Sequence, residues 1–593
     1  MRSNISLGAT PKPGTDNAVI PGTQSENDER PQDELQEPAN KELKFEDQST
    51  RMPLKKILIV YFGIGLALIV AFMDQTAVST ASPVISSDLN ASKTISWVGT
   101  AFFVGNCSFQ LVYGRLSDIF GRKYTLQAAL LLLILGDLLC SFARTPIQLY
   151  AFRAIAGVGG GGVTNIAMVI VSDIVPLKER GKYQGFISSA ASIGNAVGPF
   201  VGGGFASRSS GDWRWLFRVI AIAGVVVIVL VHFIIPLKPT QGSMVAKLKM
   251  IDYTGAVLSS AATIFLLVPI SGGGSTFPWS SATVIALLVL GVVCLIAFLF
   301  AEAKIAKLPI LPLRLFRMWT PSIIMLQSFL IGIIYYGNIY YIPIYIQYVK
   351  GHSALVSGAL VLAWTFPQSF WGVAAGFFVS KTNRYKLVLM SGATVWTLGL
   401  ALQVLWTPDT PLGEVIGFLE LSAIGIGFNL QNTLVAALAT TKNEDRAVVT
   451  GGRNYFRTLG ASFGLAIANA IYQPEVSRRL EKIGSLSPAE RESLMSSATQ
   501  YLDSLPPDVQ YSVRDAYSHG LRVVFIAFAA ICGGVLLLSF LVKEVKFRKD
   551  SPELQKEKQA NRNRRGEEPV SDDVTTESEE PPREKSGESH AQV

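Results

Sequence analysis

The chain has 593 residues, of which 49% are hydrophobic and 16% are charged, and its formal net charge is +8. An average soluble domain carries roughly 25% charged residues, so this composition excludes a chain that covers its whole surface with polar groups. The cations lie in short loops between apolar runs rather than in one basic patch, and we therefore predict no nucleic-acid partner.

The apolar residues form runs of about 18 to 25 residues, the length that crosses a hydrocarbon core of roughly 30 Å. About fifty polar residues precede the first run, which is therefore not a secretory signal peptide. The sequence predicts an all-α polytopic membrane protein with fourteen spans, near residues 56–80, 94–114, 124–143, 147–174, 184–206, 215–236, 252–270, 281–302, 319–348, 353–380, 385–406, 411–440, 447–472 and 520–543.

The two ends of the chain, residues 1–52 and 546–593, are rich in charged residues and proline. They cannot bury enough apolar area to offset their chain entropy, so we expect both to be disordered. The four cysteines lie within apolar spans without CxxC spacing, and we interpret them as packing residues with no disulfide and no metal site.

An internal repeat is visible where the fifth and thirteenth spans begin. Arg180 and Arg446 each follow an acidic residue and lie five residues before a glycine. Repeated halves around a midplane site are a common transporter architecture, and chance similarity of two cytoplasmic loops is the alternative. The predicted organisation is an N-terminal six-helix half over 53–236, an inserted helix pair with linkers over 237–302, and a C-terminal six-helix half over 303–545.

Basic residues gather in alternate loops, as the positive-inside rule requires. Their distribution places both termini in the cytoplasm and the long loop 473–519 outside, where we expect an amphipathic helix over Pro488–Ser504. The first outer loop contains Asn90-Ala91-Ser92, an N-glycosylation sequon close to the membrane.

A charged turn follows the second span, with the sequence Gly114-Arg115-Leu116-Ser117-Asp118-Ile119-Phe120-Gly121-Arg122-Lys123. A turn that only kept positive charge inside would need its basic residues alone. Gly114 allows a close helix approach, and Asp118 can accept hydrogen bonds from a helix start or an arginine. We expect Arg122 and Lys123 to hold the turn at the anionic inner leaflet.

Several spans contain ionisable residues, which are costly there and typical of function. Asp74 near the end of the first span is a candidate proton carrier. Arg153 in the fourth span needs a carboxylate or carbonyl partner, unless it reaches the outer interface. Further intramembrane charges are Asp137, Glu420, Arg453 and Arg457. Glu420 either binds a cationic substrate or a proton, or pairs with one of the two C-terminal arginines, and the residues do not separate these alternatives.

The fifth span contains glycines around one proline, at Gly194, Gly198, Pro199, Gly202 and Gly203. Proline removes an intrahelical hydrogen bond and glycines flatten one helix face, so the pattern predicts a kinked helix that packs closely and acts as a hinge. Aromatic side chains are dense in the ninth and tenth spans and could line a substrate cavity. The residues we assign to that cavity are Gln75, Tyr340, Trp364, Glu420, Asn429 and Arg453.

Four of these motifs together resemble the major facilitator superfamily. Gly114–Lys123 resembles its loop between helices 2 and 3, and Leu149–Gly161 resembles its fourth-span motif, with Ala156 in place of the usual glutamine. Gly194–Gly203 resembles the fifth-span motif of antiporters. Asp74-Gln75-Thr76 with Pro83 resembles the first-span motif of fungal fourteen-span drug:proton antiporters.

This resemblance implies a monomeric, proton-coupled antiporter that exports small organic molecules by alternating access. It implies no cofactor beyond the proton gradient, with proton coupling at Asp74 and Arg153 and a conformational latch at Gly114, Arg115, Asp118, Gly121, Arg122 and Lys123. We expect the plasma membrane, with the vacuolar membrane as the alternative.

Competing functions are a vacuolar basic amino acid or siderophore carrier of the same fold, and a non-transporting sensor. The sequence contains no P-loop and no nucleophile elbow, so we predict that it is not an enzyme.

Overall fold

The computed structural model describes residues 53–91, 94–95, 97–175, 179–206, 211–235, 243–273, 277–502 and 505–545. Predictions about the ends 1–52 and 546–593 lie outside these ranges, as does Ser92 of the predicted sequon. Asn90 itself is exposed and has a φ of 52°.

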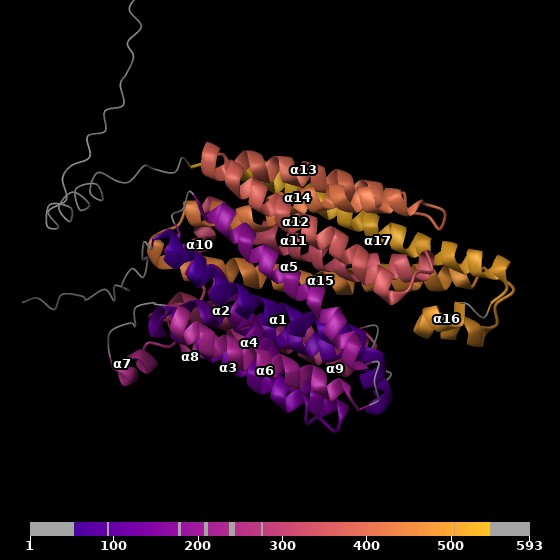
Figure 1. Cartoon of the computed structure of the whole chain (residues 1–593), viewed down its shortest axis with the longest axis horizontal. Coiled ribbons are helices and arrows are strands. Elements are labelled where there is room, and N and C mark those ends of the chain that lie inside the picture. Colours follow the sequence, from indigo (N-terminus) through magenta and orange to yellow (C-terminus); the bar gives the residue numbers. More distant parts are fainter. Residues whose placement is uncertain are drawn as a thin grey trace, which may run out of the picture. The chain divides into compact units, whose positions relative to one another are not determined.

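The regular structure of the described part is helical apart from one isolated β-bridge (Figure 1), and it is α-helical except for a short π-helix, η2, and a short 3-10 helix, η3. The long helices, each of which overlaps a predicted span, are α1 Leu54–Asp88, α2 Trp97–Phe120, α3 Arg122–Cys140, α4 Pro146–Ile174, α5 Arg180–Ala206, α6 Trp213–Ile234, α8 Tyr253–Gly272, α9 Ala282–Lys304, α11 Trp319–Ile344, α12 Ala354–Thr382, α13 Tyr385–Gln403, α14 Leu412–Ala439, α15 Arg446–Leu480 and α17 Pro507–Leu541. The short elements are α7 Met244–Lys249, α10 Arg314–Arg317, η2 Tyr345–Val349, η3 Asn443–Asp445 and α16 Pro488–Tyr501.

Several helices extend beyond the predicted spans. α15 continues to Leu480 and α17 begins at Pro507, so the predicted outer loop 473–519 is partly helical at both ends. The helix expected within this loop is present as α16, and it ends three residues before the predicted boundary. Hydropathy marks where a helix meets water, whereas the helix itself continues as long as its backbone bonds are satisfied.

The same pattern of helix packing occurs twice. In the N-terminal group, α1–α6, helix α4 packs on α2 and α3, and α1 packs on α5 and α6. In the C-terminal group, α11–α17, helix α14 packs on α12 and α13, and α11 packs on α15 and α17. α8 pairs with α9 and also packs on α2 and α15.

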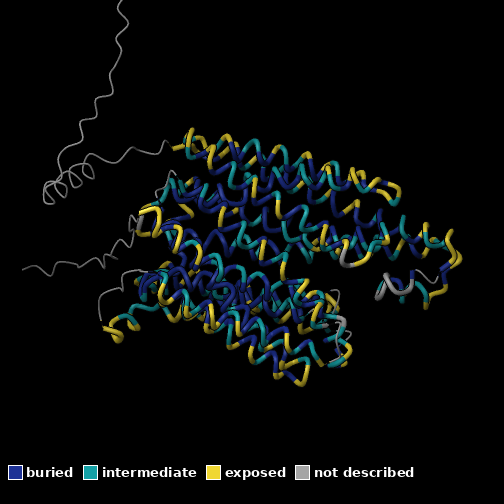
Figure 2. The backbone as a smooth tube through the Cα atoms, viewed as in Figure 1, coloured by how far each residue is buried: buried dark blue, intermediate teal, exposed yellow. Residues whose placement is uncertain are grey.

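Helices α2 and α5 of the N-terminal group pack on α15 and α12 of the C-terminal group, respectively. Ten described helices are long and apolar enough to cross a membrane, and these four helices are not among them. The position of these four helices explains their lower hydropathy, because a helix that faces protein rather than lipid can carry polar residues and glycines. Figure 2 shows buried residues in dark blue running through both groups.

Hydrogen bonds between the two groups lie toward one end of these helices, the end that carries the Gly114–Lys123 turn. Ser192 of α5 lies 2.7 Å from Ser369 of α12, and Gln431 of α14 donates to Ser188 of α5. Further along α5, toward its C-terminus, Phe200 is 62% exposed. The described structure is therefore closed at the end that carries the turn.

Candidate functional site

Three ionisable residues of the N-terminal group meet in its interior. Arg153 of α4 donates to Asp74 of α1 with Nη1–Oδ1 at 2.6 Å, and the same nitrogen lies 3.5 Å from Oδ1 of Asp137 on α3. Each of the three residues is 0% exposed. Arg153 therefore has the carboxylate partner that the sequence required, and the alternative that it reaches the outer interface is wrong.

The surroundings of this cluster are largely apolar. The Arg153 guanidinium lies 4.6 Å from the ring centre of Phe102 and 5.7 Å from that of Phe217, and its Nε donates to the Val98 carbonyl at 3.4 Å. Both oxygens of Asp137 and Oδ2 of Asp74 are buried with no hydrogen-bond partner among the described residues.

The cluster contains two carboxyl groups and one guanidinium, which gives a net charge of −1 when all three are ionised. An uncompensated charge in an apolar interior is costly, and a single bound proton removes it. The arrangement can therefore hold and release one proton. Asp137 was seen only as a further charge in the sequence, because nothing there indicates that α3 turns it toward α1 and α4.

Close helix packing by two glycines of α4 brings Arg153 to this position. A Cβ at Gly157 would meet the backbone of Phe102 on α2, and one at Gly159 would meet the backbone around Leu133 on α3. Because α4 lies so close to both helices, its arginine can reach the carboxyl groups of α1 and α3.

The proline of α5 lies directly against the same stretch of α1. Pro199 has no N–H to bond the carbonyl of Asn195, and the hydroxyl of Thr76 lies 3.4 Å from that carbonyl. The hydroxyl of Thr80 donates to the Pro199 carbonyl at 3.2 Å. The Asp74-Gln75-Thr76 motif thus connects the buried charges with the proline of α5.

The glycines around this proline can be separated by experiment. A Cβ at Gly198 would meet the Thr76 hydroxyl and the Met73 carbonyl, whereas a Cβ at Gly203 meets nothing within 4 Å. We expect Gly198→Ala to lower stability by about 1–3 kcal/mol, the typical cost of overpacking, and to reduce transport. We expect Gly203→Ala to be tolerated. Thermal unfolding of the purified variants checks this, and equal behaviour of the two variants would contradict it.

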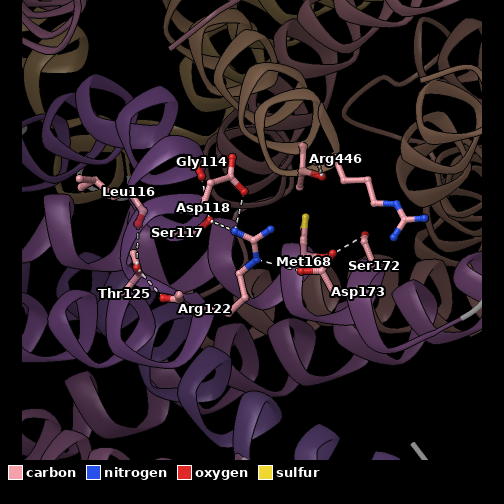
Figure 3. Close-up of polar contacts among 12 residues, drawn as sticks. Gly114, Leu116, Ser117, Asp118, Arg122, Thr125, Met168, Ser172, Asp173 and Arg446 are labelled. Carbon is pink, nitrogen blue, oxygen red and sulfur yellow. Dashed lines mark hydrogen bonds and ion pairs between the residues drawn. The ribbon is translucent and has the colours of Figure 1, made fainter. Parts of the chain in front are cut away.

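The predicted latch forms a buried ion-pair network (Figure 3). Arg122 bonds Asp118 at 2.7 Å and Asp173 of α4 at 2.8 Å, and Arg115 lies 3.5 Å from Asp118. The expectation that Arg122 faces the lipid leaflet is wrong, because its side chain is buried between the two carboxylates. Lys123 is partly exposed.

The turn Gly114–Lys123 also contacts segments outside the N-terminal group. Gly114 faces the Ala447 carbonyl of α15, the Arg115 Nε donates to the Pro309 carbonyl at 2.7 Å, and Arg446 of α15 lies beside the network in Figure 3. Gly121 has a φ of 91°, a conformation that favours glycine, and it precedes the first residue of α3.

The residues predicted to line a substrate cavity differ in how far they are exposed. Trp364 and Asn429 are fully buried, whereas Tyr340 is 57% exposed, and Gln75 and Glu420 are partly exposed. An apolar pocket lies between α2, α4 and α8, and none of the predicted cavity residues lines it.

Two tyrosines of α11 contact aromatic side chains of other helices, and one of these contacts joins the two helix groups. Tyr336 of α11 meets Phe103 of α2 with ring centres 6.0 Å apart, and Tyr335 lies 5.7 Å from Trp364. Tyr340 follows Tyr336 by one helical turn on the same face. The sequence showed these tyrosines but not which of them face the N-terminal group.

Glu420 forms no ion pair with Arg453 or Arg457 among the described residues, so the structural-bridge alternative is wrong. Arg453 is buried, and its hydrogen-bond partners among the described residues are all neutral: the Leu430 carbonyl, the Thr433 hydroxyl and the Asn454 side chain.

Residues 64–465 match the Major Facilitator Superfamily. The chain belongs to this superfamily. It is therefore an integral membrane transporter and not an enzyme, and the predicted resemblance to this superfamily is confirmed.

Two relatives place it among fungal members of the superfamily. Citrate exporter 1 of Yarrowia lipolytica is 40% identical over 508 residues, which cover 85% of this chain and 75% of the relative. Efflux pump dotC of Dothistroma septosporum is 31% identical over 499 residues, which cover 83% of this chain and 85% of the pump.

A solved structure supports the fold. The human organic anion transporter MFSD10 (TETRAN) matches with a TM-score of 0.52 and 14% identity, covering 83% of this chain and all of that chain. At this identity the likeness concerns the superfamily fold alone.

Proposed function

We propose that this protein exports small organic molecules in exchange for protons, by alternating access between its two helix groups. The observation that carries the proposal is the buried cluster of Asp74, Asp137 and Arg153, which is balanced in charge only when it holds one proton. The similarity of the chain to a fungal efflux pump and to a citrate exporter supports export as the direction of transport.

Proton binding would act through α1. Asp74 and Thr76 are two residues apart, and Thr76 contacts α5 beside Pro199. α5 in turn packs on α12 of the C-terminal group. A change in the charge of the cluster would alter how Asp74 is held, and this would reach the interface between the groups through α5.

The ion-pair network at the Gly114–Lys123 turn would hold the cytoplasmic end closed. Arg122 joins α3 to α2 and α4, and Gly114 places α2 directly on α15. Because the hydrogen bonds that join α5 to α12 and α14 lie toward this end, we assign the described arrangement to the outward-facing state.

For the membrane arrangement, we propose fourteen spans with both termini in the cytoplasm, the plasma membrane as the location, and glycosylation at Asn90. The halves are residues 53–236 and 303–545, with α8 and α9 inserted between them, and the protein works as a monomer. The four interface helices are the spans that hydropathy alone does not recognise. The vacuolar carrier of basic amino acids is disfavoured, because the charged side chain buried within the described spans of the C-terminal group is that of an arginine, Arg453, which would repel a cationic substrate.

Transport by the purified protein in sealed proteoliposomes tests the proposal. A pH difference of one unit supplies about 1.4 kcal/mol per proton, enough for about tenfold accumulation in one-for-one exchange. With an acidic lumen we expect labelled citrate or a fluorescent drug-like compound to accumulate inside, and a protonophore to abolish this accumulation. Equal accumulation with and without the pH difference would rule out proton coupling.

A further inference from the structure

Helix α15 carries two arginines one turn apart inside its predicted span, Arg453 and Arg457. We propose that this pair binds a carboxylate of the transported molecule, so that the substrate is an organic anion. The proposal rests on the export function above and names the class of its substrate.

Arg453 is 1% exposed and has no carboxylate partner among the described residues. Its terminal nitrogens donate to the Thr433 hydroxyl at 2.9 Å, to the Asn454 side-chain oxygen at 3.1 Å, and to the Leu430 carbonyl. Its Nε is buried without a hydrogen-bond partner. Neutral groups therefore orient this guanidinium but leave its charge uncompensated.

Arg457 lies one turn further along the same face and is partly exposed. Its Nε is also buried without a partner among the described residues, and no described carboxylate lies within 4.0 Å of it. A partly exposed guanidinium without a carboxylate partner can bind a planar carboxylate by donating two parallel hydrogen bonds to it.

The acidic residues of the C-terminal group do not balance this pair. Within its predicted spans the only acidic residues are Glu414 and Glu420, both on α14, and neither forms an ion pair in the described part of the chain. Two adjacent unpaired arginines in a membrane span are costly and repel each other, and a bound anion would relieve both effects. The N-terminal group shows the opposite balance, since its Arg153 has two carboxyl neighbours.

The pair also lies where a transported molecule must pass. The side chains of Asn454 and Thr458, each adjacent to one arginine in the chain, hydrogen-bond Asn165 of α4 and Gln110 of α2. The two arginines thus border the contact between the helix groups, which alternating access must open. Tyr336, which meets Phe103 of α2, supplies a hydroxyl and an aromatic face on the neighbouring helix.

Calorimetric titration of the full-length protein in detergent with citrate, at fixed pH and without a gradient, tests the site. We expect wild type to bind citrate and Arg457→Gln to bind it about ten- to hundredfold more weakly, the effect of losing charged hydrogen bonds. Arg457→Lys should fall between them, because lysine keeps the charge but not the planar fork. Arg453→Gln should also weaken binding, and if it fails to fold, the two Arg457 variants decide.

Arg478→Gln is the matched control, since Arg478 lies on the same helix but its side chain is 65% exposed and pairs with Glu475 at 3.4 Å. It should bind citrate like wild type. The proposal is overturned if Arg457→Gln binds citrate as wild type does, or if wild type binds none of citrate, malate and benzoate. If the protein transports a cationic dye with the proton gradient but does not bind citrate, the carboxylate site is wrong and the export function stands. If it binds citrate but shows no proton-driven transport, the carboxylate site stands and the proposed proton-coupled export is wrong.

Discussion

Replacing Asp74 with asparagine is expected to abolish transport driven by a pH gradient while leaving the protein folded. Asparagine keeps the shape of the side chain and an oxygen that faces the Arg153 Nη1, which lies 2.6 Å from Asp74 Oδ1 in the wild type. The remaining pair, Asp137 and Arg153, is balanced without a proton, so the cluster no longer needs to bind one. At a pH difference of one unit, accumulation should therefore fall about tenfold, to the level seen without a gradient.

The measurement is substrate accumulation in proteoliposomes, read beside substrate exchange at equal pH on both sides. Asp74→Asn should lose gradient-driven accumulation and keep exchange at equal pH, because exchange needs only the movement of the helix groups. Asp137→Asn changes the net charge by the same amount and should also lose coupling. Asp508→Asn, at an exposed position in the first turn of α17, is the control and should behave like wild type. Gradient-driven accumulation that survives in Asp74→Asn would remove Asp74 from the mechanism.

The sequence predicted the positions of the long helices mainly because ten of those described contain a strongly apolar run near the thickness of a bilayer. It did not predict how far they extend into water: α1 continues to Asp88, beyond the predicted boundary at residue 80. Nor could hydropathy identify the interface helices, since a polar residue facing a partner helix and one facing solvent look alike in sequence.

The candidate site was predictable only where a residue is unusual within its own helix. Asp74 and Arg153 stand out as charges among apolar residues, but their contact with Asp137 depends on how three helices are rotated about their axes. Arg122 shows the same limit. Its positive charge and its place in a loop predicted a position at the lipid surface. In the structure it is buried and donates to Asp173, 51 residues further along the chain. Contacts of such long range follow from tertiary packing and not from local pattern.

Replacing Arg153 with methionine is expected to prevent stable folding. Methionine has a similar length and would fill the space beside Phe102, but it leaves the carboxyl groups of Asp74 and Asp137 buried without a counter-charge. Removing one partner of a buried ion pair costs about 3–5 kcal/mol, a large part of the stability of most proteins. Thermal unfolding in detergent, read by fluorescence and by size-exclusion chromatography, should show a marked loss of folded protein.

Compensating substitutions distinguish a loss of charge balance from a loss of packing. If unpaired charge is the cause, adding Asp74→Asn and Asp137→Asn to Arg153→Met should restore most of the folded protein, because the interior is then neutral. Gradient-driven transport should stay absent, since no group in the cluster can carry a proton. Arg153→Lys should fold better than Arg153→Met because it keeps the positive charge. If Arg153→Met alone is as stable as wild type, the two carboxyl groups are neutral without the arginine, and charge balance in this cluster cannot be what couples proton binding to transport.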